Sequence, residues 1–223
     1  EPMKKYINAL VFVTVLCLSS EAYADSPDPN PERFSKDINT FAVWDSKNTF
    51  PENAILFVGS SSVLFWPTAT AFPGKPIINR GFGGSEISDV IYFYDQVIKP
   101  YAPTKIFLYA GDNDVGHGKM ADQVFEDYKE LVTIVQSDFP KVDLIYISIK
   151  PSKLRWGKWP QMVEANRLVR EYSESHPNLG YADLAAPLLD ADGNLRDVFV
   201  DDGLHLNERG YFLWQQALAP HLD

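Results

Sequence analysis

Two distant segments of the chain carry the residue types of nucleophilic catalysis. Three consecutive serines, residues 60–62, follow an apolar run at 54–58, and near the other end Asp202 and His205 lie three residues apart. One turn can bring that carboxylate to the imidazole ring, where it would fix the histidine tautomer and stabilise its charged form, as a general base requires. The alternatives are structural, because serine is a favoured helix N-cap and an Asp–His segment can be a surface loop.

Two further loops contain groups that can stabilise a negatively charged oxygen. Loop 79–85 holds three glycines, which let a backbone approach a ligand closely. Asn113 follows the apolar run 106–110, and its side-chain amide can donate to an oxyanion, although asparagine is also an ordinary turn residue. The glycine spacing is G-x-G-G and not G-x-G-x-x-G, so we discount a dinucleotide site.

Nearby residues of metal-ligand type form a weaker pattern. Asp112, Asp114 and His117 stand close together in the sequence, but such a cluster is too generic to assign a metal. We therefore predict neither a metal nor an organic cofactor.

The elements that position these loops follow from the hydrophobic pattern. Runs that are apolar throughout alternate with amphipathic helical patterns, which is typical of a parallel sheet covered on both faces. In such a sheet, ligands bind beyond the carboxyl ends of the strands, where the loops described above would gather. We predict a three-layer α/β/α sandwich with a five-stranded parallel sheet. The strand candidates are 54–58, 77–78, 106–110, 144–149 and 181–184, and the helical patterns lie near 34–44, 85–98, 121–138, 160–175 and 208–219.

The N-terminal residues are typical of a secretory signal peptide. Lys4 and Lys5 precede an apolar run at 7–18, which is too short to span a bilayer, and Ala-Tyr-Ala follows at 22–24. We predict cleavage after residue 24 and an exported protein, periplasmic or secreted, with a retained anchor helix as the alternative. Residues 1 and 2 precede a methionine and are interpreted as additions to the natural start.

The predicted mature chain contains one domain. Cleavage would remove Cys17, the only cysteine, so the domain would hold no disulfide. Residues 25–33 are polar and rich in proline, which predicts a flexible leader, and residues 34–223 form the catalytic domain. The formal charge of −10 argues against a nucleic-acid partner and gives no help in binding an anionic membrane. We expect no stable membrane insertion of the mature chain; composition leaves the oligomeric state open.

Together the four segments resemble the SGNH (GDSL-type) hydrolase superfamily over residues 54–218. The resemblance implies a flavodoxin-like sheet order and a Ser61–His205–Asp202 triad. It also implies an oxyanion hole formed by the N–H groups of Ser61 and Gly84 and by the Asn113 amide. Ser60 replaces the usual aspartate of G-D-S, which leaves residues 60 and 62 as alternative nucleophiles. The G-x-S-x-G elbow of α/β-hydrolases is excluded by the valine at position 63.

The function that the resemblance implies is hydrolysis of carboxylic esters through an acyl-enzyme. Short acyl chains are expected, with acetyl groups on carbohydrate as one case, so the partner would be a small-molecule or carbohydrate ester. Four aromatic residues are predicted to contact substrate, namely Trp66, Phe82, Trp156 and Trp159. Two alternatives remain on the same fold: a carbohydrate O-acetyltransferase and a non-catalytic carbohydrate-binding module.

Overall fold

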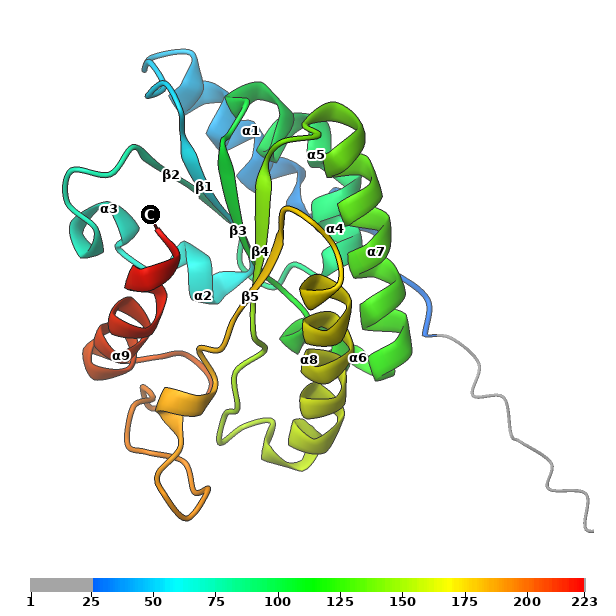
Figure 1. Ribbon diagram of the computed structural model, residues 1–223, viewed down its shortest axis with the longest axis vertical. Helices are drawn as coiled ribbons and strands as arrows, with labels where there is room; N and C mark the ends of the chain where they lie inside the picture. The colour runs from blue at the N-terminus through cyan, green and yellow to red at the C-terminus, as the bar shows by residue number, and fades with distance from the viewer. Residues whose placement is uncertain (1–25, 223) are drawn as a thin grey trace, which may run out of the picture.

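Five parallel strands form one sheet in the order β2-β1-β3-β4-β5 (Figure 1). The structure is a computed structural model that describes residues 26–222. The strands are β1 (Ile55–Gly59), β2 (Ile77–Gly81), β3 (Lys105–Tyr109), β4 (Asp143–Ile147) and β5 (Leu179–Ala182). Both the five-stranded parallel sheet and its flavodoxin-like order are confirmed.

Helices cover both faces of the sheet, which accounts for strands that are apolar throughout (Figure 1). One face is covered by α1 (Ser35–Asp45), α4 (Ile87–Tyr92), α5 (Tyr94–Val97), α6 (Asp112–His117), α7 (Ala121–Asp138) and α8 (Trp159–Glu174). The other carries α2 (Ser61–Leu64), α3 (Thr68–Ala71) and α9 (Glu208–Leu218). Short 3₁₀ helices occur at Pro31–Phe34, Lys99–Tyr101, Trp156–Lys158, Ala186–Leu188 and Ala219–His221.

The two faces bury separate hydrophobic clusters. Alternate residues of β1 enter opposite clusters, with Leu56 and Val58 in one and Ile55 and Phe57 in the other. Trp214 of α9 is fully buried in the second cluster, and its Nε1 donates to the Leu184 carbonyl at 2.8 Å. This packing fixes α9, and therefore the loop that precedes it, against the sheet.

One predicted helix is divided in the structure. The pattern at 85–98 forms α4 and α5, because Phe93 has non-helical backbone angles (φ −96°, ψ 16°) and serves as the cap of both. The break allows Phe93 and Tyr94, which are adjacent in sequence, both to be buried. The apolar pattern alone continues through this point, so it could not reveal the break.

The predicted flexible leader is corrected for residues 26–33. The backbone N–H of Ser26 donates to Gln123, the Asp28 carboxylate lies 2.6 Å from the Lys119 ammonium, and Asn30 caps the first 3₁₀ helix. Proline-rich composition indicated a leader without structure, but the Ser26 backbone and the Asp28 side chain find partners on α7 and on the segment just before it. The predicted signal peptide lies outside the described residues.

No helix within residues 26–222 combines the length and the apolar character needed to cross a bilayer.

Candidate active site

Ser61, His205 and Asp202 form a continuous chain of hydrogen bonds. Ser61 Oγ lies 2.9 Å from His205 Nε2, and His205 Nδ1 lies 2.5 Å from Asp202 Oδ2. Ser60 and Ser62 are buried, at 0% and 1% exposure, and only Ser61 of the three serines contacts the imidazole. The geometry thus singles out Ser61 where the sequence left three serines open.

A sharp turn after β1 presents Ser61. Gly59 has φ +131°, and a Cβ there would lie 1.9 Å from the Tyr109 carbonyl oxygen, so only glycine fits. Ser60 N then donates to that same oxygen at 2.9 Å, which ties the turn to the end of β3. Ser61 is the first residue of α2, so its N–H belongs to the first turn, where helix amides lack an intrahelical acceptor.

Residues 198–207, which we call the acid–base loop, carry Asp202 and His205 and are closed by their own hydrogen bonds. Val200 N donates to the His205 carbonyl at 2.9 Å, and Asp202 Oδ1 accepts from the amides of Leu204 (2.8 Å) and His205 (2.9 Å). Asn207 caps α9 through its side chain. The loop therefore orients the carboxylate and the imidazole as one unit.

The hydrogen bond from the His205 side chain, together with those from the two amides, lowers the pKa of Asp202 to about 2. Asp202 is therefore a carboxylate at neutral pH and accepts the Nδ1 proton of His205. The other ring nitrogen, Nε2, is then left to accept from the Ser61 hydroxyl.

Three groups near Ser61 can receive an oxyanion. Among the described residues, the amides of Ser61 and Gly84 donate to no protein acceptor. A Cβ on Gly83 would lie 3.7 Å from Ser61 Cβ, so the glycine loop passes directly beside Ser61. Asn113 Nδ2 donates to the Ser85 carbonyl at 3.0 Å and keeps a second hydrogen for another acceptor.

Arg155 is a site residue that sequence reasoning missed. Its guanidinium donates to Asn113 Oδ1 at 2.9 Å and to the Asp112 carbonyl at 2.8 Å. Because the oxygen of the Asn113 amide is held in this way, the NH₂ group must point in the opposite direction. Arg155 lies in the loop after β4, at the carboxyl edge of the sheet, where the other loops of the site also lie. This position in the sequence is the signal that could have indicated a role for Arg155.

The buried Asp112 balances the charge of Arg155. Burial alone would raise the pKa of Asp112, but the Lys150 ammonium and the Arg155 guanidinium outweigh it and lower that pKa. Lys150 is itself buried beneath this carboxylate, at 3.3 Å. The charges of Asp112, Lys150 and Arg155 are therefore paired with one another, and this pairing holds Arg155 where it contacts Asn113.

The three residues considered as possible metal ligands each contact a different partner. Asp112 pairs with Lys150 and Arg155, Asp114 accepts from the Ile87 amide, and His117 contacts Glu86 at 2.6 Å. Within the described residues, no group of three or more His, Cys, Asp or Glu side chains is placed to hold a metal ion.

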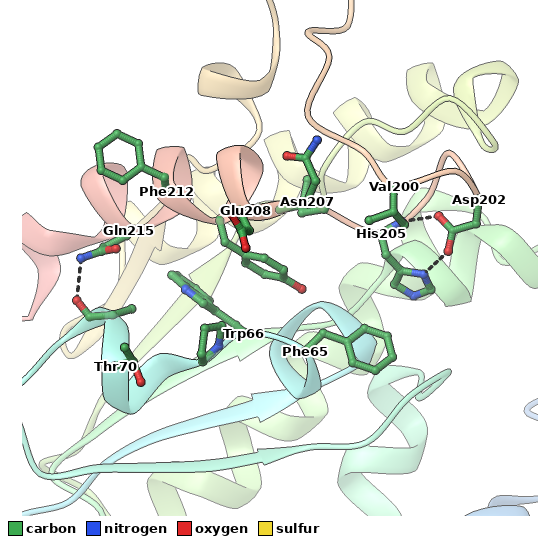
Figure 2. Close-up of a pocket in the computed structure, with 14 residues that line it drawn as sticks. Phe65, Trp66, Thr70, Val200, Asp202, His205, Asn207, Glu208, Phe212 and Gln215 are labelled. Carbon is green, nitrogen blue, oxygen red and sulfur yellow. Dashed lines mark hydrogen bonds and ion pairs between the residues drawn. The ribbon is translucent and has the colours of Figure 1, made fainter.

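A groove of about 970 Å³ has Asp202 and His205 among its lining residues (Figure 2). Its walls come from α3 and the segment before it, from the acid–base loop and from α9. The lining residues are Phe65, Trp66, Pro67, Thr70, Ala71, Val200, Asp202, His205, Leu206, Asn207, Glu208, Tyr211, Phe212 and Gln215.

The predicted aromatic contacts are only partly placed at this groove. Trp66 lines it, although it is 2% exposed, whereas Phe82 is 1% exposed and packs edge-on against Phe34 in the core. The prediction that Phe82 contacts substrate is therefore wrong, because its ring turns toward the sheet. Trp156 and Trp159 stack on each other at the start of α8 and do not line the groove.

The chain is similar to acylhydrolases in sequence and in fold. Residues 62–213 match the profile of the GDSL-like Lipase/Acylhydrolase family. A search of curated proteins finds no match. The sequence match begins one residue after Ser61, so the placement of Ser61 depends on the geometry described above.

Solved structures share the fold at low sequence identity. A candidate platelet activating factor from Streptococcus pneumonia has a TM-score of 0.76 at 24% identity, covering 86% of this chain and 94% of its own. A GDSL-like lipase from Bacteroides thetaiotaomicron has a TM-score of 0.69 at 16% identity (86% and 97%). A catalytic mutant of Axe2, an acetylxylan esterase from Geobacillus stearothermophilus, has a TM-score of 0.65 at 15% identity (78% and 95%).

Proposed function

The chain belongs to the GDSL-like lipase/acylhydrolase family, and from that premise we propose that it hydrolyses carboxylic esters of short-chain acids with Ser61 as the nucleophile. The observation that carries the proposal is the 2.9 Å contact between Ser61 Oγ and the Nε2 of a histidine whose Nδ1 is held by Asp202. This is the geometry that converts a weakly nucleophilic hydroxyl into an attacking group.

The first half of the reaction forms an acyl-enzyme. Ser61 Oγ attacks the ester carbonyl while His205 Nε2 takes the hydroxyl proton. The imidazolium that results is stabilised by the Asp202 carboxylate. His205 then gives the proton to the alkoxide oxygen, the carbon–oxygen bond breaks and the alcohol leaves.

The second half returns the enzyme to its starting state. A water molecule gives a proton to His205 Nε2 and attacks the acyl-enzyme carbonyl, and the carboxylic acid leaves as Ser61 recovers its proton. In both halves the tetrahedral oxyanion would accept from the amides of Ser61 and Gly84 and from the second N–H of Asn113. A donor of this kind typically contributes about 3–4 kcal/mol to transition-state stabilisation.

A short acyl group is favoured by the glycine loop. A Cβ on Gly83 would make ordinary van der Waals contact with Ser61 Cβ at 3.7 Å and with Leu64 Cδ2 at 3.5 Å, so this loop bounds the space beside Ser61. The acetylxylan esterase among the structural neighbours acts on an ester with an acyl group of this size. The likeness to that protein is one of fold, so acyl length is a matter for measurement.

The test is hydrolysis of p-nitrophenyl acetate by the wild type, Ser61→Ala and Ser60→Ala. Ser60 is the matched control, because it is adjacent and buried and its hydroxyl has no partner among the described residues. We expect Ser61→Ala to lose activity by at least about a thousandfold, Ser60→Ala to keep it, and an organophosphonate to label Ser61 alone. Equal activity of the wild type and Ser61→Ala would overturn the proposal.

The same preparation separates the transferase alternative. An acetyltransferase would deliver the acyl group to an added sugar acceptor faster than to water, and product analysis with and without that acceptor measures the ratio. Acetylated sugar as the main product would replace hydrolysis by transfer, with Ser61 in the same role. An inert, unlabelled protein would favour a binding module.

A further inference from the structure

We propose that the groove beside His205 binds the alcohol part of the ester, and that this alcohol is apolar, either a long alkyl chain or an aryl group. The inference rests on the proposed function and extends it, because it assigns the two halves of the substrate to different sides of Ser61.

The position of the groove relative to the catalytic groups is the first observation. Asp202, His205 and Phe65 form one end, and Thr70 and Gln215 lie at the other (Figure 2). The His205 and Phe65 rings meet edge to face, with centroids 5.1 Å apart. The base therefore belongs to the wall of the groove, whereas Gly84 and Asn113, which would face the oxyanion, do not.

Chemistry then determines which half of the ester lies there. His205 must protonate the departing oxygen, so the alcohol has to leave from the His205 side of the tetrahedral carbon. A substituent on that oxygen continues into the space next to the imidazole, which is the groove. The acyl substituent extends from the same carbon in another direction, on the side of the glycine loop that passes beside Ser61.

The walls of the groove favour an apolar occupant. Most of their exposed area is apolar, and three exposed hydrophobic side chains, Phe65, Val200 and Phe212, are among the lining residues. A groove of this composition gains free energy by burying alkyl or aryl surface. Asp202 and Glu208 line the same groove and disfavour an anionic alcohol.

Three polar side chains in the walls use their side-chain groups within the protein. The Tyr211 hydroxyl donates to the Ser62 carbonyl at 3.0 Å, Gln215 Nε2 donates to the Ala71 carbonyl at 2.6 Å, and Asn207 caps α9. A sugar must replace its hydrogen bonds to water with hydrogen bonds to the protein, and these three groups are already engaged in a wall that is mostly apolar. We therefore infer an apolar alcohol in preference to a carbohydrate.

Isomeric esters test the assignment without changing overall hydrophobicity. Hexyl acetate and ethyl hexanoate have the same formula, and their alcohols have similar acidity, so only the side that carries the long chain differs. We expect the wild-type kcat/KM for hexyl acetate to exceed that for ethyl hexanoate by about tenfold or more, since each buried methylene contributes about fourfold. Ethyl acetate serves as the common reference.

Variants connect any preference to the groove. Thr70→Trp would fill it from an exposed position on α3, and Ala69→Trp, one residue earlier and outside the lining, is the matched control. Thr70→Trp should lower the ratio of kcat/KM for hexyl acetate to kcat/KM for ethyl acetate by about fivefold or more, because the longer alkyl chain loses more contact with the groove. Ala69→Trp should leave this ratio unchanged. Phe212→Asp, on α9, is an independent test, because a charge in the apolar wall should also lower kcat/KM for hexyl acetate.

The possible results separate this inference from the proposed function. If p-nitrophenyl acetate is hydrolysed through Ser61 but ethyl hexanoate is preferred, or the isomers are equal, the groove does not hold the alcohol. A preference for hexyl acetate that survives both groove variants also overturns the inference. Loss of all ester hydrolysis, with no labelling of Ser61, overturns the proposed function itself and this inference with it.

Discussion

Arg155 reaches the active site from the loop after β4 and holds the oxygen of the Asn113 amide at 2.9 Å. It does not contact Ser61, His205 or Asp202 in the structure, so its expected role is to position a donor rather than to react. Without it, the Asn113 amide can rotate and turn its oxygen toward the developing oxyanion.

We expect Arg155→Met to lower kcat by about tenfold to a hundredfold and to change KM little, because the lost interaction exists only in the transition state. Arg155→Lys keeps the charge beside Asp112 but cannot donate to two oxygens in a fixed fork, so it should recover only part of the rate. Steady-state kinetics on p-nitrophenyl acetate measures both.

A double-mutant cycle with Asn113→Ala decides whether Arg155 acts through that amide. If it does, Arg155→Met adds little to a protein that already lacks Asn113. Fully additive losses would show that Arg155 supports the fold and not the donor.

Asp202 differs from its neighbour Asp201, which has no hydrogen bond to His205. Asp202→Asn should lower kcat by on the order of a thousandfold or more, since an amide cannot stabilise the imidazolium and leaves the histidine tautomer unfixed. Asp201→Asn is the control and should keep nearly full activity. Similar losses in both variants would contradict the assignment.

The lowered pKa of Asp202 also has a consequence for acid behaviour. Its folded pKa of about 2 lies below the ordinary value of 3.8, so its stabilising contribution is complete above about pH 4 and is lost as the pH falls toward 2. Acidification from pH 4 toward pH 2 should therefore lower the free energy of unfolding more in the wild type than in Asp202→Asn, which has no carboxylate to protonate. Urea unfolding of both proteins at the two pH values measures this.

At the scale of elements, a charged cluster lies where α6 meets the start of α7. The buried Lys119 ammonium is at its centre, and it pairs with the buried carboxylates of Glu86 and Asp114 and with the more exposed carboxylates of Asp28 and Asp127. Burial raises the pKa of Asp114 to about 7, despite the nearby Lys119 ammonium. The folded state thus binds a proton more tightly at Asp114 than the unfolded state does.

This raised pKa predicts a pH-dependent stability. The contribution of Asp114 to stability decreases as the pH rises from about 4 to about 7. In this range the unfolded chain loses the Asp114 proton readily, whereas the folded protein must either keep that proton or bury a charged carboxylate. Asp114→Asn removes the titration, so its stability relative to wild type should improve between pH 5 and pH 8 by on the order of 2 kcal/mol. Urea unfolding at the two pH values measures the change, with the exposed Asp122→Asn as control. Equal shifts in both variants would sink the prediction.

The sequence predicted elements best where one periodicity ran without interruption. The pattern at 121–138 has the same bounds as α7, and the apolar runs indicated four of the five strands closely. The fifth strand, β5 (Leu179–Ala182), shares only residues 181–182 with the predicted range 181–184. β2 extends past its apolar residues because the polar Asn79 side chain finds hydrogen-bond partners there. Its Nδ2 donates to the Val63 carbonyl, and its Oδ1 accepts from the Gly81 amide. Local pattern could not show such a contact.

Site prediction succeeded or failed according to how local the signal was. Asp202 and His205 are three residues apart, so their contact could be expected from spacing. Arg155 meets Asn113 across 42 residues, and Tyr211 and Phe212 enter the groove only because α9 packs against the segment after α2. Phe82 was misplaced since a loop residue can turn inward, which neither composition nor order reveals.

At the scale of the molecule, export remains a prediction from the first 24 residues. Expression of the full chain should yield, outside the cytoplasm, a protein whose N-terminal residue is Asp25, as measured by intact mass and N-terminal sequencing. Retention of Cys17 in the recovered protein would contradict cleavage. The contacts of Ser26 and Asp28 with the domain begin directly after this site, so a tag placed there would require a spacer.

The acid–base loop is held by its own hydrogen bonds, and it stands after an exposed turn at Gly193. A chain divided at that glycine would have Ser61 and the three proposed oxyanion donors on one fragment, and Asp202 and His205 on the other. Neither fragment alone carries a working site, while α9, through Trp214, offers a large apolar surface for rejoining. The two fragments are therefore suited to a split-enzyme reporter. Each fragment would be fused to one of two proteins, and ester hydrolysis would then report the association of those proteins.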